Sequence, residues 1–157
     1  MAIETWELLS YVVTVLGLPL AMAVFLYEKR KERVAEEEEV YESLAASYQD
    51  FLRLALENPD LRLMSKARTH DLTDVQRERM QAIFGLLIAL FERAYLMLYE
   101  TDLSGKEARR WRSWEDFMQE WCAREDFRAA MPELLHGEDP AFAAYLRKLA
   151  ADAESST

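Results

Sequence analysis

Apolar residues dominate the start of the chain, where no charged residue occurs over the twenty positions from Leu8 to Tyr27. Twenty residues of α-helix span about 30 Å, which is the thickness of the hydrocarbon core of a bilayer. Trp6, Tyr11 and Tyr27 lie near the two ends of this run, where amphipathic aromatic rings favour the membrane interface. The pattern therefore predicts a transmembrane helix over about residues 8–27.

Two other interpretations of this run remain open. Ala21-Met22-Ala23 has the form of a signal-peptidase site, but the residues before the run are acidic and the apolar run continues past it. The third interpretation is a helix buried in a soluble domain. We expect an anchor, because the run has the length of a membrane span and charged residues flank both of its ends.

The flanking charges predict the orientation. Glu4 and Glu7 precede the run without any Lys or Arg, whereas Lys29, Arg30, Lys31 and Arg33 follow it. The positive-inside rule then places the N-terminus outside and the C-terminal part in the cytoplasm, with the chain crossing the inner (cytoplasmic) membrane once. Residues 1–33 would form the anchor with its flanks.

One face of the predicted anchor carries small and hydroxylated residues. Ser10, Thr14, Gly17 and Ala21 follow each other at spacings of four, three and four, which places them on one stripe. Such a stripe lets a second helix approach closely, and hydroxyl groups can bond across the contact. We therefore expect a homo-oligomer held by these residues, although small residues are also common in membrane helices that do not pair.

Beyond the anchor the pattern is helical throughout, which predicts an all-α fold in which the first helix continues into a cytoplasmic bundle of four or five helices over residues 34–152. Residues 153–157 are expected to be a disordered tail. An amphipathic helix from Val40 should end at Asn58-Pro59, because proline disfavours helical backbone in the residue before it.

The next helix should begin at Thr73, which has Gln76 as a capping-box partner. Glu92-Arg93 limits its uncharged run to residues 80–91, which is too short for a second span, so we expect the central helix of the bundle. Leu86, Leu90 and Met97 are expected to widen its apolar face. Three residues should cap the later helices: Ser104, with Glu107 as its capping-box partner; Asp126; and Asp139, which precedes Pro140. The predicted core includes Phe84, Leu87, Phe91, Trp114 and Trp121.

The composition and the motifs argue against several classes of function. The 29 acidic residues against 19 basic ones give a net charge of −10, which argues against nucleic-acid binding. The single cysteine, Cys122, excludes an intrachain disulfide and agrees with a reducing compartment. No nucleotide-binding, hydrolase or metal motif occurs, so we expect no catalytic activity, no cofactor and no metal.

Two charged groups are candidates for other roles. Lys106, Arg109, Arg110 and Arg112 lie beside Trp111 and Trp114, which suggests contact with an anion or a partner, or tryptophans in the core and arginines paired with neighbouring acids. Glu92 and Arg93 interrupt an apolar helix, so they are a candidate buried polar pair or a contact between subunits.

The histidines invite a comparison with helical ribonucleases of the HEPN type, in which histidine follows arginine by four to six residues. Here Arg62 and His70, like Arg128 and His136, are eight positions apart, and only Lys66 precedes His70 at the family's distance.

In layout the chain resembles bacterial single-pass membrane proteins with a small helical cytoplasmic domain. It is similar to membrane proteins encoded beside CRISPR effectors, whose HEPN-like fold lacks the catalytic pair. That similarity implies oligomers that perturb the membrane.

We therefore expect a membrane-anchored helical interaction module that self-associates and acts as a scaffold or regulatory subunit. The alternative is an oligomeric membrane-perturbing or pore-forming protein, such as a defence effector. Its expected partners are the lipid bilayer, further copies of itself and an unidentified protein.

Overall fold

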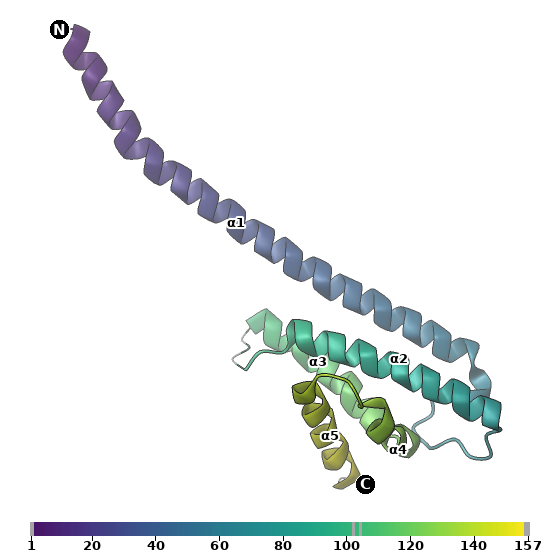
Figure 1. Ribbon diagram of the computed structural model, residues 1–157. Coiled ribbons are helices and arrows are strands. Elements are labelled where there is room, and N and C mark those ends of the chain that lie inside the picture. The colour runs from purple at the N-terminus through teal and green to yellow at the C-terminus, as the bar shows by residue number, and fades with distance from the viewer. Residues whose placement is uncertain (1, 102, 104, 156–157) are drawn as a thin grey trace. The chain divides into compact units, whose positions relative to one another are not determined.

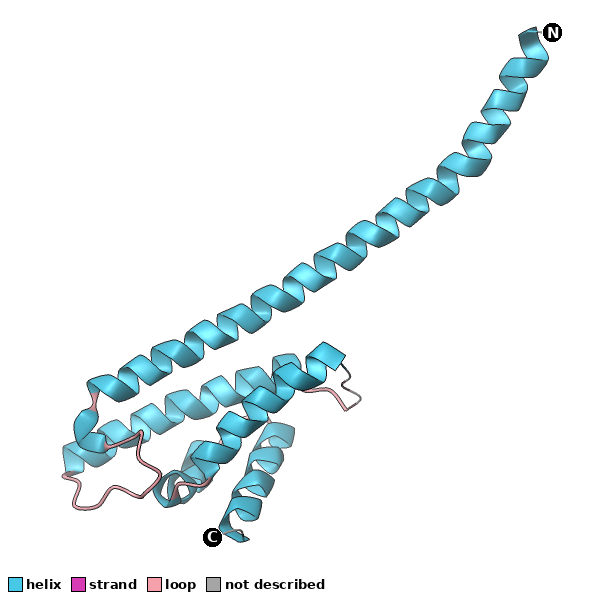
Figure 2. Ribbon diagram, turned by 180° about the vertical axis from the view of Figure 1, so that it is seen from behind, coloured by secondary structure: helices cyan, strands magenta, loops and turns pink. Residues whose placement is uncertain are grey.

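The computed structural model describes the backbone of residues 2–101, 103 and 105–155, and the side chains of residue 17 and of those from 19 onward in these ranges. This part of the chain is all-α, with no strand, as predicted (Figures 1 and 2). The chain forms two compact units, Met1–Tyr41 and Glu42–Thr157. The elements are α1 (Ala2–Glu57), the 3-10 helix η1 (Pro59–Leu61), α2 (Asp74–Leu98), α3 (Gly105–Cys122), α4 (Glu125–Leu134) and α5 (Pro140–Ser155).

The first helix continues from the predicted anchor into the bundle, as expected from a sequence with no Gly or Pro between Tyr27 and Asn58. It runs through Pro19 without interruption and ends at Glu57, directly before Asn58-Pro59. The side-chain amide of Asn58 donates a hydrogen bond of 2.8 Å to the carbonyl oxygen of Leu54. This bond satisfies one of the carbonyl groups that a helix C-terminus leaves without a partner.

The core of the second unit is built from all of its helices, with Phe84 and Phe91 of α2, Trp114 of α3, Phe127 of α4 and Phe142 of α5 among its buried rings. The five residues predicted to be buried are at most 5% exposed, which confirms them. The Trp114 ring stands edge-on to Phe91, with 6.5 Å between ring centroids, and the Trp121 ring stands edge-on to Phe84 at 6.2 Å. Edge-to-face pairs of this kind add stability beyond the burial of their area.

The C-terminal turns of α1 pack on α3 through aromatic rings. Tyr48 stacks on Phe117 with 4.5 Å between centroids, and Phe51 stands edge-on to Trp121 at 5.4 Å. The indole N–H of Trp121 donates to the Tyr48 hydroxyl at 3.4 Å, which satisfies the buried donor of the indole ring. These contacts attach the last part of α1 to the bundle.

Two predicted caps are confirmed. Thr73 and Gln76 form a reciprocal capping box at the start of α2. The Asp139 carboxylate accepts hydrogen bonds of 2.9 Å from the backbone N–H groups of Ala141 and Phe142, at the start of α5. That helix continues to Ser155, into the segment predicted as a tail.

The other local predictions are wrong, confirmed only in part, or outside the described residues. The predicted cap by Asp126 is wrong, because the N-cap of α4 is Arg124, two residues earlier, and the Asp126 carboxylate binds Arg124. The predicted cap at Ser104 lies outside the described residues. On α2, Leu90 is buried as expected, but Leu86 and Met97 are 59% and 56% exposed, so they do not widen the buried face.

Within the described residues, α2 is the one helix that is long and apolar enough to cross a membrane. Part of it is buried inside the protein, where Phe84, Leu87 and Phe91 contribute to the core. This arrangement is that of a central bundle helix, as the sequence predicts. In the predicted span, the side chains of residues 8–16 and 18, half of the twenty, lie outside those that are described.

Candidate functional site

Large apolar side chains cover α1 between Leu20 and Tyr27. Leu20 is 68% exposed, Phe25 57% and Tyr27 71%, and Met22, Val24 and Leu26 are also exposed. Successive helical residues point about 100° apart, so these side chains surround the helix rather than forming one stripe. An apolar surface on every side of a helix requires apolar surroundings on every side.

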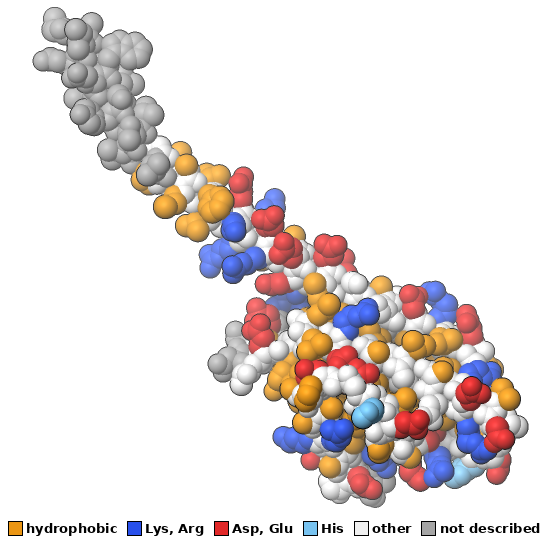
Figure 3. Space-filling model, viewed as in Figure 1, with side chains coloured by type: hydrophobic (Ala, Val, Ile, Leu, Met, Phe, Trp, Pro, Cys, Tyr) orange, Lys and Arg blue, Asp and Glu red, His pale blue; other side chains and the backbone are white. Residues whose placement is uncertain are grey.

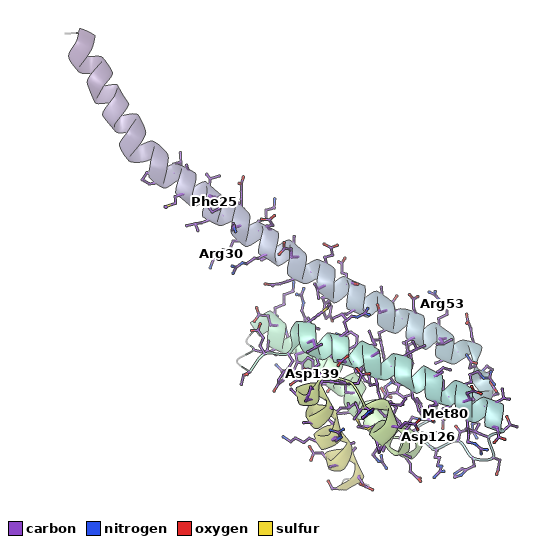
Figure 4. The ribbon with its side chains drawn as sticks, in the orientation of Figure 1. Phe25, Arg30, Arg53, Met80, Asp126 and Asp139 are labelled. Carbon is purple, nitrogen blue, oxygen red and sulfur yellow. The ribbon has the colours of Figure 1, made fainter. Side chains whose placement is uncertain are left out.

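A band with four basic residues, interleaved with Glu28 and Glu32, follows this apolar segment; we call it the basic band. The side chains of Lys29, Arg30, Lys31 and Arg33 are all exposed, and Figure 3 shows blue side chains next to the orange ones. The Lys29 ammonium lies 5.8 Å from the centroid of the Phe25 ring, and Figure 4 labels Phe25 and Arg30 on successive turns. A basic band beside an apolar helix is suited to phosphate headgroups at a membrane surface.

The predicted oligomerisation stripe is described only at its C-terminal end. Gly17 and Ala21 are exposed, and a Cβ atom placed on Gly17 would meet no atom within 4 Å. The side chains of Ser10 and Thr14 lie outside the described residues. The described half of the stripe therefore offers open space that a second helix could fill.

The two tryptophans beside the basic cluster on α3 are buried. Lys106, Arg109 and Arg112 are exposed and Arg110 is half-buried, and the Arg112 Nε–H donates to the Ala108 carbonyl oxygen at 3.4 Å. The neighbouring rings of Trp111 and Trp114 are only 5% and 2% exposed. Since stacking on bases needs accessible ring faces, these tryptophans serve the core.

The candidate pair Glu92 and Arg93 is divided between two faces of α2. Arg93 is exposed, whereas Glu92 is half-buried and accepts a hydrogen bond from the backbone N–H of Asp139. Glu92 also shares a hydrogen bond with Glu138, which together with partial burial raises the pKa of the Glu138 carboxyl above its usual value. Glu92 thus connects the C-terminal third of α2 to the turn between α4 and α5.

Both histidines are exposed, and His70 lies in the loop before α2. Arg128, eight positions before His136, donates to the carbonyl oxygens of Cys122 and Ala123 at 2.7 and 2.8 Å. Arg128 therefore provides hydrogen-bond donors for carbonyl groups at the C-terminus of α3. Within the residues described, no group of three or more His, Cys, Asp or Glu side chains is placed to hold a metal ion.

The most extensive polar contact in the bundle was not predicted. Arg124 is 3% exposed, and its Nη1 donates to the carbonyl oxygens of Leu63 at 3.2 Å, Arg62 at 3.3 Å and Ser65. Its Nε and Nη2 bind the two oxygens of Asp126 at 3.0 and 2.7 Å. One guanidinium therefore fixes the 62–65 loop to the start of α4.

Comparison of the chain with protein-family models, with curated proteins and with solved structures found no match.

Proposed function

We propose that this chain is a membrane-anchored helical interaction module that self-associates and serves as a scaffold or regulatory subunit. Its N-terminal helix crosses the inner membrane with the N-terminus outside, and its bundle lies in the cytoplasm. The observation that carries the proposal is the apolar surface around residues 20–27, followed directly by the basic band. Burial in lipid of each large apolar side chain there is worth roughly 1.5–3 kcal/mol.

Assembly through the anchor is the functional part of the proposal. Lipid supplies no hydrophobic drive between helices, so close packing along Ser10, Thr14, Gly17 and Ala21 supplies the attraction. A scaffold needs only a dimer, whereas a pore needs a ring of anchor helices, and no described feature favours the ring.

The first test is localisation and topology of the full chain. We expect it to resist alkaline extraction from membranes, and a reporter fused after Thr157 to be active only in its cytoplasmic form. Recovery in the soluble fraction would refute the anchor. Periplasmic activity of the fusion would refute the orientation.

The second test is the assembly in detergent, followed by native mass measurement. Gly17→Ile should lower the oligomeric fraction, because the added side chain separates the helices without reducing the tendency to insert. Ala23→Ile is the matched control, since at about 100° per residue Ala23 lies about 150° around the helix from the middle of the Ser10–Ala21 stripe. A monomeric wild type would refute self-association, and an assembly large enough to close a ring would favour the pore.

A further inference from the structure

A second stripe follows the outer side of α2, opposite its buried face. We define the α2 stripe as the exposed residues at spacings of three or four along this helix. Its largest apolar members, Val75, Leu86 and Leu96, are 70%, 59% and 60% exposed. Figure 3 shows orange side chains of this kind at the surface of the bundle. The stripe consists of Val75, Glu78, Ala82, Leu86, Ala89, Arg93 and Leu96.

The α2 stripe has the composition of a helix–helix contact. Its centre is Leu86 between Ala82 and Ala89, and small residues beside a large one let two helices pack closely. The exposed positions of α3 differ, because they include Arg109, Arg112 and other polar residues at nearly every turn. Charge is depleted at the core of protein interfaces, which distinguishes the middle of the α2 stripe from such a solvated face.

The two charges of the stripe identify its occupant. Glu78 lies on the N-terminal side of Leu86 and Arg93 on the C-terminal side, at nearly equal distances along the helix. We infer that the α2 stripe binds the α2 stripe of a second copy of this chain, with the two helices antiparallel. This arrangement places each Glu78 against Arg93 of the other copy, whereas a parallel pair would place like charges together.

The register follows from the same symmetry. With a twofold axis beside Leu86, Ala82 packs against Ala89 of the other copy, and Val75 packs against its Leu96. Glu78 and Arg93 are fifteen residues apart, or about 22 Å along the helix at 1.5 Å per residue. Contact at both ends therefore needs a shallow crossing, of about 20°, and yields a closed dimer that leaves no free copy of the stripe.

This interface adds to the proposed function and rests on it, because anchoring in one membrane is what makes the association of the bundles strong. One pair of helices buries less than the roughly 1,200–2,000 Å² of a stable interface, so free bundles would associate weakly. Anchoring two copies in one membrane raises their effective concentration without any new contact. The anchor stripe and the α2 stripe would then act together in one assembly.

The test uses full-length chains in lipid vesicles and engineered cysteines on the stripe. A chain carrying Ala82→Cys is mixed with one carrying Ala89→Cys and oxidised briefly. The antiparallel register predicts that the mixture gives several-fold more cross-linked dimer than either chain alone. Cross-linking of each chain mainly to itself would overturn the antiparallel register.

Charge reversal then tests the complementarity. Glu78→Arg or Arg93→Glu placed in both partners should lower the heterodimer yield at least threefold. Adding Glu78→Arg to one partner and Arg93→Glu to the other should restore it, because opposite charges again face each other at both ends. Lys148→Glu, an exposed site on α5, is the control for net charge. Heterodimer yields that stay the same when the charges are reversed would overturn the inference.

The same samples separate the two proposals. Failure of the chain to sediment with vesicles would refute the membrane anchor, while the cross-linking pattern at raised protein concentration would still decide the α2 interface. Membrane-bound oligomers without the predicted 82–89 cross-link would overturn the α2 interface and leave the anchored module standing.

Discussion

The Arg124 guanidinium and the Asp126 carboxylate form two parallel hydrogen bonds, Nε to Oδ1 at 3.0 Å and Nη2 to Oδ2 at 2.7 Å. The side chains are only 3% and 11% exposed, so each charge has little access to water and depends on the other. Asp126 also accepts from the backbone N–H of Thr69 at 3.2 Å. The pair therefore joins a loop before α2 to the start of α4, two segments far apart in the sequence.

Removal of this guanidinium should destabilise the bundle strongly. Arg124→Met leaves the Asp126 carboxylate buried without its partner, and breaking a buried pair in this way typically costs about 3–5 kcal/mol. Denaturant unfolding of the full chain in detergent, followed by tryptophan fluorescence, should report a loss of this size. Arg124→Lys should recover only part of it, because an ammonium group cannot supply the planar fork of donors.

The control for Arg124 is the exposed pair Arg53 and Asp50. Their Nη1–Oδ1 distance is 3.1 Å, but both side chains are about 70% exposed. Exposed pairs of this kind contribute about 0–1 kcal/mol, so Arg53→Met should change the free energy of unfolding little. Equal losses for Arg124→Met and Arg53→Met would contradict the structural role of Arg124.

The Cys122 thiol should be unreactive in the folded protein. Burial raises its pKa to about 12, and Arg128 offsets this only in part. At pH 8 the thiolate is then roughly one part in ten thousand of the total, against about a quarter for a free thiol of pKa near 8.5. Ellman's reagent should react rapidly with the chain in denaturant and very slowly with the native chain. Comparable rates in the two states would refute this burial.

Truncation of the aromatic core should also be costly. Phe91→Ala and Trp114→Ala each remove a ring that is at most 2% exposed, and such changes typically cost about 3–5 kcal/mol. Because the two rings touch, the double variant should lose less than the sum of the single losses. Thermal unfolding of the full chain checks this. Leu56→Ala is the control, since Leu56 is 68% exposed and should contribute within about 0.5 kcal/mol.

Local sequence signals predicted the helices and most of their ends. The Thr73–Gln76 capping box, the stop at Asn58-Pro59 and the Asp139 cap each involve residues within three positions of each other. Their chemistry can therefore be identified without knowledge of the fold. The buried rings of α2 and α3 were predictable for the same reason, because helical periodicity alone places them on one face.

What the sequence did not predict depends on distant partners. Asp126 has the residue type of a helix cap, but its carboxylate is bound to Arg124, whose other bonds go to carbonyl groups about sixty positions earlier. Leu86 continues the apolar pattern of α2, yet no element covers it in the described chain. Glu92 has an adjacent arginine, but it bonds to the backbone of Asp139, a partner that only the folded chain brings near.

The last prediction concerns the carboxyl pair Glu92 and Glu138. The shared hydrogen bond, followed by partial burial and the charge of Glu92, raises the pKa of Glu138 in the folded chain. The folded state therefore binds this proton more tightly than the unfolded state does. Its contribution to stability is complete below the unfolded pKa, near 4.5, and disappears as the pH rises through the raised folded pKa.

Glu138→Gln removes this dependence, because the amide stays neutral and can still donate a hydrogen bond to Glu92. The melting temperature of Glu138→Gln should exceed that of wild type at pH 7.5, and the difference should shrink as the pH is lowered toward about 4.5. Glu133→Gln, at an exposed position of α4, controls for the change in net charge. If the two variants differed from wild type by the same amount at every pH, Glu92 and Glu138 would not share a proton in the folded chain.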